Sequence, residues 1–369
     1  MAREIHIHNK SDKPDNIIIK EALTEEKCSE IESTFPSFLR GYFLFLKSSL
    51  LPLSRLAYLQ DTKFFLNYLI TDTDLTNAKE ISKIKQSDFQ KIKAMDINIF
   101  IEYCRRYKVE KENGTYIFQN DNRSLARKRS SISVLFKYLF REEMVPKNIT
   151  DGFNPIRLPK AGDKEIKALH DDEVMIMLDA VSNATGLTKK EKQYWEKTKL
   201  RDRAMLLVFV TYGLRLSELH QLNLSSFNFN REEFKIFRKR GKETIMPLNG
   251  SVTKALNDYI KNERPMPSDT GGVDKDALFL SLQGKRMTER QIRQMVKKYT
   301  SIALGTDRDS GYSPHKLRAT TATSLIEKGN SIFDVQELLN HDNITTTQLY
   351  AAHRKNAKND LIKDIEWED

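Results

Sequence analysis

Four short polar segments in the second half of the chain combine residue types that could act on a phosphate group. The first is TYGLRLSEL, in which Gly213 can end one helix and Arg215 can open the next. A guanidinium beside the free backbone N–H groups of a helix N-terminus is a good arrangement for binding phosphate. Taken alone, an arginine that pairs with Glu218 three residues later is the commoner explanation.

The second and third segments are also basic. PHKLR places His315 and Arg318 three residues apart, and therefore on one face of a helix, as a solvated basic face would too. The third segment is the turn KRGK of a predicted hairpin. Its Lys239 and Lys242 could enter a DNA groove or could simply face solvent.

The fourth segment, LLNHDNITTTQLY, contains His341 and Tyr350. Asn340 can end one helix in the left-handed conformation, and Thr345 can cap a following helix that would carry the tyrosine. A tyrosine in that place could also fill an apolar gap. Each of the four segments is therefore ambiguous by itself.

The order of these residues along the chain removes the ambiguity, because it is the order seen in the tyrosine recombinase, or phage integrase, family. The residues in question are Arg215, Lys239, His315, Arg318, His341 and Tyr350. The sequence resembles this family from about Leu169 to Tyr350, including GLRLSEL, RKRGKETIMPL, ALFLSLQGKRMTERQI, SPHKLRATTATSLIEKG and VQELLNHDNITTTQLY. NRSLARKRSSISVLFKYL followed by NPIRLPK is similar to the end of the family's helical core-binding domain and its linker. Ala319 and Asn340 depart from the residues usual in relatives, His and Gly, and neither change removes a catalytic group.

The resemblance implies a site-specific recombinase that cleaves and rejoins DNA strands through a 3′-phosphotyrosyl intermediate at Tyr350. Arg215 and Arg318 would each bind the non-bridging phosphate oxygens bidentately, without changing protonation state. No metal, nucleotide or other cofactor is expected, because the bond energy is retained in the covalent intermediate. The sequence contains neither a GxxxxGK[ST] motif nor clustered carboxylates suited to two metal ions.

The remaining roles follow from the same resemblance. His315 is the candidate that accepts the phenol proton, because an imidazole titrates near neutrality. Lys239 is the candidate general acid for the leaving 5′ oxygen, in preference to Lys242, because its distance from Pro247 matches that in relatives' hairpins. His341 would hydrogen-bond the phosphate. Glu218 would orient its neighbours.

The resemblance also implies the partners. Double-stranded DNA with a specific recombination site would lie in a clamp between the helical and catalytic domains, with a homotetramer on two sites and no role for a membrane. A C-terminal cluster of Leu361, Ile362, Ile365 and Trp367 would dock into a neighbouring protomer or pack within its own chain. A second recombinase or accessory factor stays open, as does the choice among inversion, excision, integration and resolution. The expected DNA-binding residues are Arg123, Arg127, Lys128, Arg157, Lys160, Arg240 and Lys242.

Two other functions are compatible with parts of this pattern. A type IB topoisomerase would share the nucleophile and the phosphate-binding groups but would relax supercoils as a monomer. A silent DNA-binding regulator would have no physical reason to keep the full set from Arg215 to Tyr350. The matching segments are closer to recombinases than to topoisomerases. Residues 1–33 are too few for a separate arm-binding domain, which favours a simple recombinase of the Xer or DNA-inversion kind.

The elements that must position these residues are predicted to be mainly α-helical. Helical periodicity indicates a core DNA-binding bundle over residues 34–153, after an N-terminal extension over 1–33. Asn154-Pro155 and the following LPKAG predict a linker over 154–168. A mostly α catalytic domain with a small antiparallel β-sheet follows over 169–350, and a tail helix for subunit contact over 351–369.

Local signals place the elements within these domains. The last bundle helix is expected from Ser124 to Glu142, after a polar loop from Lys108 to Asp121. Glu233–Phe237 and Glu243–Leu248 read as the two strands of a hairpin. The polar insert Thr188–Lys199 has no assigned role. Further helices are expected at Asp171–Ala184, Leu200–Thr211, Ser251–Arg264, Thr288–Tyr299, Ser313–Lys328 and Ile332–Leu339.

Composition is consistent with this assignment. The 369 residues carry 61 Lys and Arg against 51 Asp and Glu, a net charge of +10, which favours a polyanionic partner. The two cysteines, Cys28 and Cys104, form no CxxC, so neither a disulfide framework nor a zinc site is expected. No apolar run suggests a membrane span or a signal peptide, so we expect a cytoplasmic protein.

Overall fold

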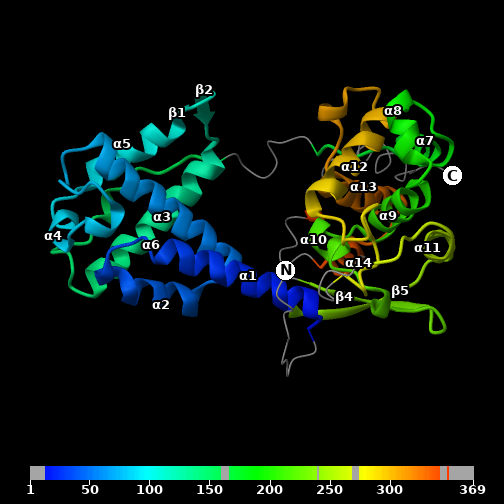
Figure 1. The fold of residues 1–369 in the computed structure, drawn as a ribbon, viewed down its shortest axis with the longest axis horizontal. Coiled ribbons are helices and arrows are strands. Elements are labelled where there is room, and N and C mark those ends of the chain that lie inside the picture. The colour runs from blue at the N-terminus through cyan, green and yellow to red at the C-terminus, as the bar shows by residue number, and fades with distance from the viewer. Residues whose placement is uncertain (1–12, 159–165, 239–240, 268–273, 341–346, 349–369) are drawn as a thin grey trace, which may run out of the picture. The chain divides into compact units, whose positions relative to one another are not determined.

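The computed structural model describes residues 13–158, 166–238, 241–267, 274–340 and 347–348 of the chain. Contacts divide the chain into two compact units (Figure 1). The helical unit runs from Ile17 to Pro159, and the C-terminal unit is formed by the rest of the chain. The division after Pro159 falls inside the expected linker. Within the described residues, no helix is long and apolar enough to cross a membrane.

The helical unit is built around its last long helix, as the apolar stripe of that segment predicts. Asp121 caps this helix by accepting a hydrogen bond from the Ser124 backbone N–H at 2.8 Å. Leu125, Ile132 and Leu135 are fully buried along one side, which packs against α3. The elements of the unit are α1 (Asp15–Glu32), α2 (Arg40–Ser49), α3 (Pro52–Asp72), α4 (Gln86–Phe89), α5 (Ala94–Arg105), β1 (Arg106–Lys111), β2 (Gly114–Gln119) and α6 (Asn122–Arg141).

Helix α1 precedes residue 34, where hydrophobic periodicity predicted the bundle to begin. Its sequence, DNIIIKEALTEEKCSEIE, is largely polar, so periodicity gave little sign of it. Cys28 on this helix belongs to the hydrophobic core of the helical unit, as does Cys104 on α5. Both cysteines are free and buried.

The segment from Lys108 to Asp121, predicted to be a loop, is instead a β-hairpin followed by the helix cap. β1 pairs antiparallel with β2, and Tyr107 lies opposite Phe118. These two rings stack with their centroids 5.2 Å apart, and the centroid of the Tyr107 ring also lies 5.0 Å from that of Phe64 on α3. The loop prediction was wrong because it relied on the polar residues of the segment. The aromatic side chains that hold the hairpin find their partners only in the folded unit.

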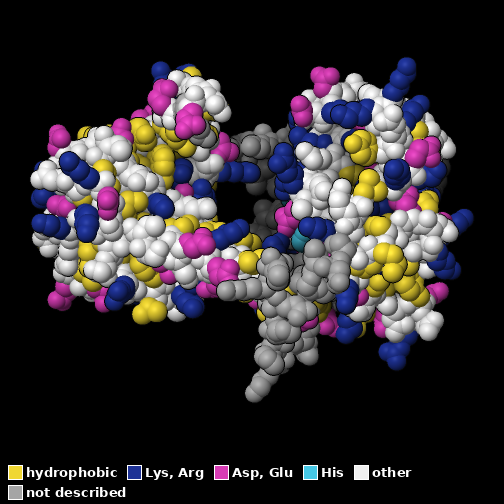
Figure 2. All heavy atoms as spheres, in the orientation of Figure 1, with side chains coloured by type: hydrophobic (Ala, Val, Ile, Leu, Met, Phe, Trp, Pro, Cys, Tyr) yellow, Lys and Arg dark blue, Asp and Glu magenta, His cyan; other side chains and the backbone are white. Residues whose placement is uncertain are grey.

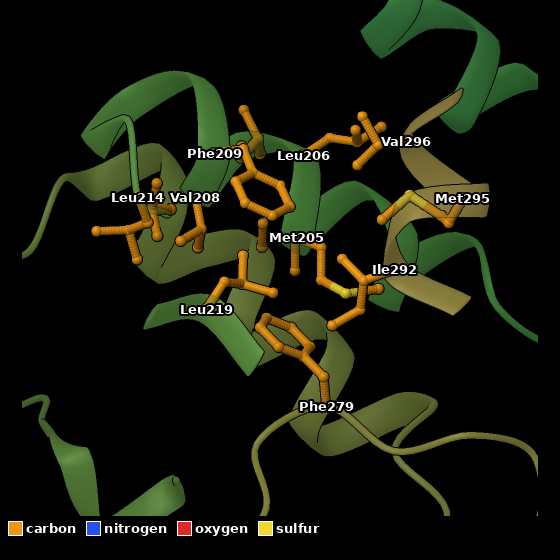
Figure 3. Packing of buried hydrophobic residues seen from close by; sticks show 14 of the residues in the cluster. Met205, Leu206, Val208, Phe209, Leu214, Leu219, Phe279, Ile292, Met295 and Val296 are labelled. Atoms are coloured by element: carbon orange, nitrogen blue, oxygen red, sulfur yellow. The ribbon is translucent and has the colours of Figure 1, made fainter. Parts of the chain in front are cut away.

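The C-terminal unit has a helix, α9, surrounded by other helices. Figure 3 shows Met205, Leu206 and Phe209 of α9 packed among residues of several elements. α9 contacts α7, α11 and α13 and is apolar on most sides, as a buried central helix should be. The helices of this unit are α7 (Asp171–Asn183), α8 (Lys189–Trp195), α9 (Lys199–Tyr212), α10 (Leu216–His220), α11 (Gly250–Asn262), α12 (Glu289–Ala303), α13 (Pro314–Glu327) and α14 (Ile332–Leu339).

A small antiparallel sheet accompanies these helices, as expected. Its strand order is β3 (Phe227–Asn228), β4 (Glu233–Phe237) and β5 (Glu243–Pro247). In β4 the side chains alternate: Phe234 and Ile236 are buried, and Lys235 between them is exposed. The β4–β5 pairing ends with Phe237 opposite Glu243, so the residues between them form the tip of the hairpin.

The insert Thr188–Lys199 contains a short docked helix, α8. Thr188 caps it through a capping box with Glu191. The Glu191 carboxylate accepts a hydrogen bond from Arg308 Nε at 2.9 Å, and Trp195 donates its indole N–H to the Val181 carbonyl at 2.7 Å. Burial alone would raise the pKa of Glu191, but hydrogen bonds from Arg308 and Thr188 lower it to about 2. The insert therefore ties the end of α7 to the segment before α13.

Helix α14 begins and ends at the predicted residues, and α13 is one residue shorter at each end than predicted. Pro314 occupies the first turn of α13, and α14 ends at Asn340 in the left-handed conformation, with φ of 48°. A small apolar cluster packs α14 on α13 and includes Ala322, Val335 and Leu339. This contact fixes the C-terminal end of α14 beside α13.

Candidate active site

Arg215 and Glu218 form a closed pair at the start of α10. Arg215 is the N-cap residue, and the Glu218 carboxylate accepts both its backbone N–H at 2.8 Å and its guanidinium Nη1 at 2.7 Å. Glu218 is 3% exposed, whereas the side chain of Arg215 is 34% exposed. The pairing proposed as the commoner explanation is thus present. It leaves part of the guanidinium open to solvent.

Arg318, one turn into α13, lies near Arg215 but is buried. Its Nη1 donates to the Gly213 carbonyl at 2.7 Å and its Nη2 donates to the Leu339 carbonyl. Arg215 donates its Nη2 to the next carbonyl, that of Asn340, at 3.1 Å. The structure therefore brings together the two arginines that the sequence predicted, at the end of α14. Arg318 is only 1% exposed, so the two are not equivalent.

Gly213 allows this close approach. It ends α9 with φ of +58°, a conformation that glycine adopts without steric cost. A Cβ added there would lie 2.5 Å from Leu339 Cδ2. The glycine therefore lets α14 pack directly on the turn whose carbonyl accepts the Arg318 bond.

His315 lies one turn before Arg318 on α13 and is exposed. The pKa of its imidazole is lowered from the ordinary 6.5, first by partial desolvation and then by the positive charges of Arg318, Lys316 and Arg215. A lowered pKa keeps the ring neutral at physiological pH. A neutral imidazole is the form that can accept a proton.

Arg238 is a site residue that was not predicted. It follows β4 directly, is 3% exposed, and donates Nη2 to the Leu338 carbonyl at 2.8 Å and Nη1 to the Leu339 carbonyl at 3.1 Å. Burial lowers the pKa of its guanidinium, which nevertheless stays charged. The alternation Phe234, Ile236, Arg238 continues the buried face of the strand. That period of two was the signal in the sequence that could have found it.

Three arginines from three separate segments thus converge on three consecutive carbonyls, those of Leu338, Leu339 and Asn340. These carbonyls lie at the C-terminal end of α14. The last carbonyls of a helix have no partner within the helix, and this end carries the negative end of the helix dipole. Among the described residues, Glu218 is the carboxylate paired with this group. Three guanidinium groups and one carboxylate leave an excess of positive charge, which suits an anion.

Several predicted site residues lie outside the described residues. They are Lys160, Lys239, Arg240, His341 and Tyr350. Arg238 directly precedes Lys239, and Asn340 directly precedes His341. The described residues contain no cluster of three His, Cys, Asp or Glu side chains that could hold a metal ion.

The basic residues predicted to contact DNA from the helical unit differ in accessibility. Lys128 is 11% exposed on its side chain, donates Nζ to Asp61 at 3.2 Å, and lies over the Phe64 ring at 4.7 Å. Arg127 is more exposed but binds the same carboxylate. Burial raises the pKa of Asp61, and the charges of Lys128 and Arg127 oppose that effect. This pairing commits Lys128 to the helical unit itself.

Other predicted contact residues are accessible. Arg123 and Arg157 of the helical unit and Lys242 of the hairpin are exposed. On the face drawn in Figure 2, Lys and Arg side chains occur on both units and alternate with Asp and Glu. Basic surface is therefore available on each unit, although it is not confined to the predicted residues.

Comparison with known proteins gives consistent results. The model of the phage integrase family matches residues 167–357. Tyrosine recombinase XerC of Natranaerobius thermophilus is 32% identical over 301 residues, which cover 80% of this chain and 91% of that protein. Tyrosine recombinase XerD of Staphylococcus epidermidis is 31% identical over 294 residues, covering 80% and 85% of the two chains.

Two solved structures share the fold. A XerH site-specific recombinase bound to palindromic difH substrate, in a post-cleavage complex, matches with a TM-score of 0.60 at 17% identity, covering 98% of this chain and 99% of that one. A lambda integrase fragment, crystallised as a dimer bound to a core site, matches with a TM-score of 0.56 at 14% identity, covering 90% and 97%. These likenesses bear out the mainly α architecture with small antiparallel sheets.

Proposed function

The chain belongs to the phage integrase family of tyrosine recombinases and is a site-specific recombinase, and we propose that it cleaves and rejoins double-stranded DNA through a phosphotyrosyl bond at Tyr350. The observation that carries the proposal is the convergence of Arg215, Arg238 and Arg318 at the end of α14, with Glu218 as their carboxylate partner. This group has the excess positive charge that binding a phosphodiester requires.

The proposed reaction exchanges one phosphate ester for another. The Tyr350 oxygen attacks phosphorus, a new P–O bond forms, and the bond to the 5′ oxygen breaks with its electron pair. A 3′-phosphotyrosyl ester and a free 5′-hydroxyl result. Because one ester replaces another, no external energy source is needed, and a 5′-hydroxyl from a second strand can reverse the step.

Two proton transfers balance this exchange. The phenol proton passes to His315, whose lowered pKa keeps it neutral and able to accept. The leaving 5′ oxygen takes a proton from Lys239. Both protons return when the incoming 5′-hydroxyl attacks, so the enzyme is restored. In the proposed transition state, the exposed part of Arg215 donates to a non-bridging oxygen, and His341 adds a further hydrogen bond.

The arrangement on DNA is a further part of the proposal. We expect Arg123, Arg157 and Lys242 to contact the phosphate backbone, since all three are exposed. Contacts from Lys160 and Arg240 are proposed from their sequence positions. We expect the protein to act as a homotetramer on two sites.

The nucleophile can be tested directly. Tyr350→Phe should bind its DNA site but form no covalent protein–DNA adduct with a nicked suicide duplex, analysed on a denaturing gel. Tyr194→Phe is the matched control, because Tyr194 is an exposed tyrosine of the same unit that the mechanism does not use. If the Tyr350→Phe variant still forms the adduct, Tyr350 is not the nucleophile.

The assembly can be tested by removing the tail. Truncation after Lys358 keeps Tyr350 and every arginine of the site. If the tail docks into a neighbouring protomer, the truncated protein should still bind one site and lose cooperative loading and recombination. Recombination at the full rate would show that the tail is not the link between subunits.

A further inference from the structure

We propose that Arg238 is a positioning residue that fastens the β4–β5 hairpin to the end of α14, and so restrains the chain next to the general acid Lys239. The inference rests on the proposed function, because it concerns how that site is assembled. In this proposal Arg238 acts through the hairpin, by binding the carbonyls of α14, and does not itself contact the phosphate.

Arg238 connects the two elements through its side chain and its backbone. The side chain donates to the carbonyls of Leu338 and Leu339 at 2.8 and 3.1 Å. The backbone N–H donates to the Lys242 carbonyl at 2.8 Å, and the backbone carbonyl accepts the Gly241 N–H at 3.1 Å. One residue thus closes the hairpin tip and attaches it to α14.

The burial of this arginine is hard to explain by stability alone. Its Nε is buried and has no hydrogen-bond partner, and no carboxylate lies within salt-bridge distance of it among the described residues. The negative charge of Glu218 raises the pKa of Arg238, and the positive charge of Arg215 lowers it. An apolar side chain is often at least as stabilising as a buried charge at such a position. An arginine is useful there because it can bind two carbonyls at once.

The hairpin needs such an attachment if its tip carries the general acid. The β4–β5 ladder ends at Phe237 and Glu243, and beyond it the described backbone hydrogen bonds of the tip are the two made by Arg238. A general acid must lie within hydrogen-bonding reach of the leaving oxygen. A displacement of about 1 Å can lower a rate about a hundredfold. Because Arg238 directly precedes Lys239, its attachment to α14 limits how far the general acid can move.

The test measures whether loss of Arg238 acts through protonation of the leaving group. The substrates are two nicked duplexes carrying a site selected by the protein from a random pool, one with the ordinary 5′ oxygen and one with sulfur in its place. A thiolate leaves without a proton, so the sulfur substrate bypasses the general acid. The variants are Arg238→Met and Arg238→Lys, with Lys239→Ala as the reference for a missing acid.

Arg286→Met is the matched control for the loss of a guanidinium bound to backbone. Arg286 also donates to two backbone carbonyls of the same unit, those of His220 and Leu222, both at 3.0 Å. These carbonyls lie at the end of α10 rather than α14. Thermal unfolding and gel-shift binding are measured for every variant. Arg238→Lys keeps the charge, so it carries the test if Arg238→Met does not fold.

We expect both Arg238 variants to cleave ordinary DNA at least about tenfold more slowly than the wild type, and to recover most of that loss with the sulfur substrate. Arg286→Met should show no such selective recovery. If the Arg238 variants cleave ordinary DNA at the wild-type rate, or are slowed equally on both substrates, the positioning role is overturned. If the wild-type protein forms no adduct with either substrate, the proposed function itself fails.

Discussion

Replacing Glu218 by glutamine tests how strongly the site depends on its carboxylate. The substitution keeps the shape of the side chain, but an amide has only one acceptor oxygen. The carboxylate accepts two bonds, from the Arg215 backbone at 2.8 Å and from its guanidinium at 2.7 Å. In Glu218→Gln the amide NH₂ must face one of these two donors. One bond is therefore lost, and a positive charge is left without its partner.

The size of the effect follows from that loss. A hydrogen bond to a charged group contributes about 1.5–3 kcal/mol. Because the Arg215 side chain is 34% exposed, water replaces part of the interaction, so the free energy of unfolding should fall by about 1–2 kcal/mol. For a unit of this size, that corresponds to a melting temperature lower by about 2–8 °C. The freed guanidinium should also slow cleavage about tenfold.

Thermal unfolding and suicide-substrate cleavage measure the two effects separately. Glu337→Gln is the control, because Glu337 is an exposed carboxylate on α14, close to the site along the chain. Its stability and cleavage rate should stay near those of the wild type. If Glu218→Gln also unfolds and cleaves like the wild type, the pair does not hold Arg215 in place and the reasoning is wrong.

Three further predictions follow from the site. Arg215→Lys and Arg318→Lys keep the charge but lose the fork, so each should slow cleavage by more than about tenfold, roughly 1.4 kcal/mol of barrier, with much less effect on DNA affinity in gel shifts. Equal losses of cleavage and binding would make them ordinary anchoring contacts. Lys316→Gln removes a positive charge that lowers the pKa of His315, so that pKa should rise. Since only the neutral imidazole accepts a proton, the acid limb of the cleavage rate should then move to higher pH. An unmoved limb would count against His315 as the base. Gly213→Ala forces a side chain into a left-handed backbone and against α14, so it should cost about 1–2 kcal/mol of unfolding free energy from the backbone alone. Unchanged denaturant unfolding would contradict the close packing.

Local sequence patterns were sufficient for much of the fold. Helix α14 begins and ends at the predicted residues, and Asn340 adopts the predicted left-handed conformation. Helix α12 begins directly after Thr288, the residue at which its helix was predicted to start, and Thr288 and Gln291 form a capping box there. These features depend on residues close together in the chain, so spacing and residue type suffice to predict them. The likeness to tyrosine recombinases was also contained in the order of residues along the chain.

What only the tertiary structure decided is which groups become partners. The sequence marked Lys128 as a candidate DNA contact, but in the structure it binds Asp61, which comes from α3. It also left Arg238 unnoticed. The carbonyls that bind Arg238 belong to a helix about a hundred residues further along the chain. The physical reason is the same in both cases. A charged side chain is buried or exposed according to the surface that packs onto it, and that surface comes from a distant segment which no local pattern specifies.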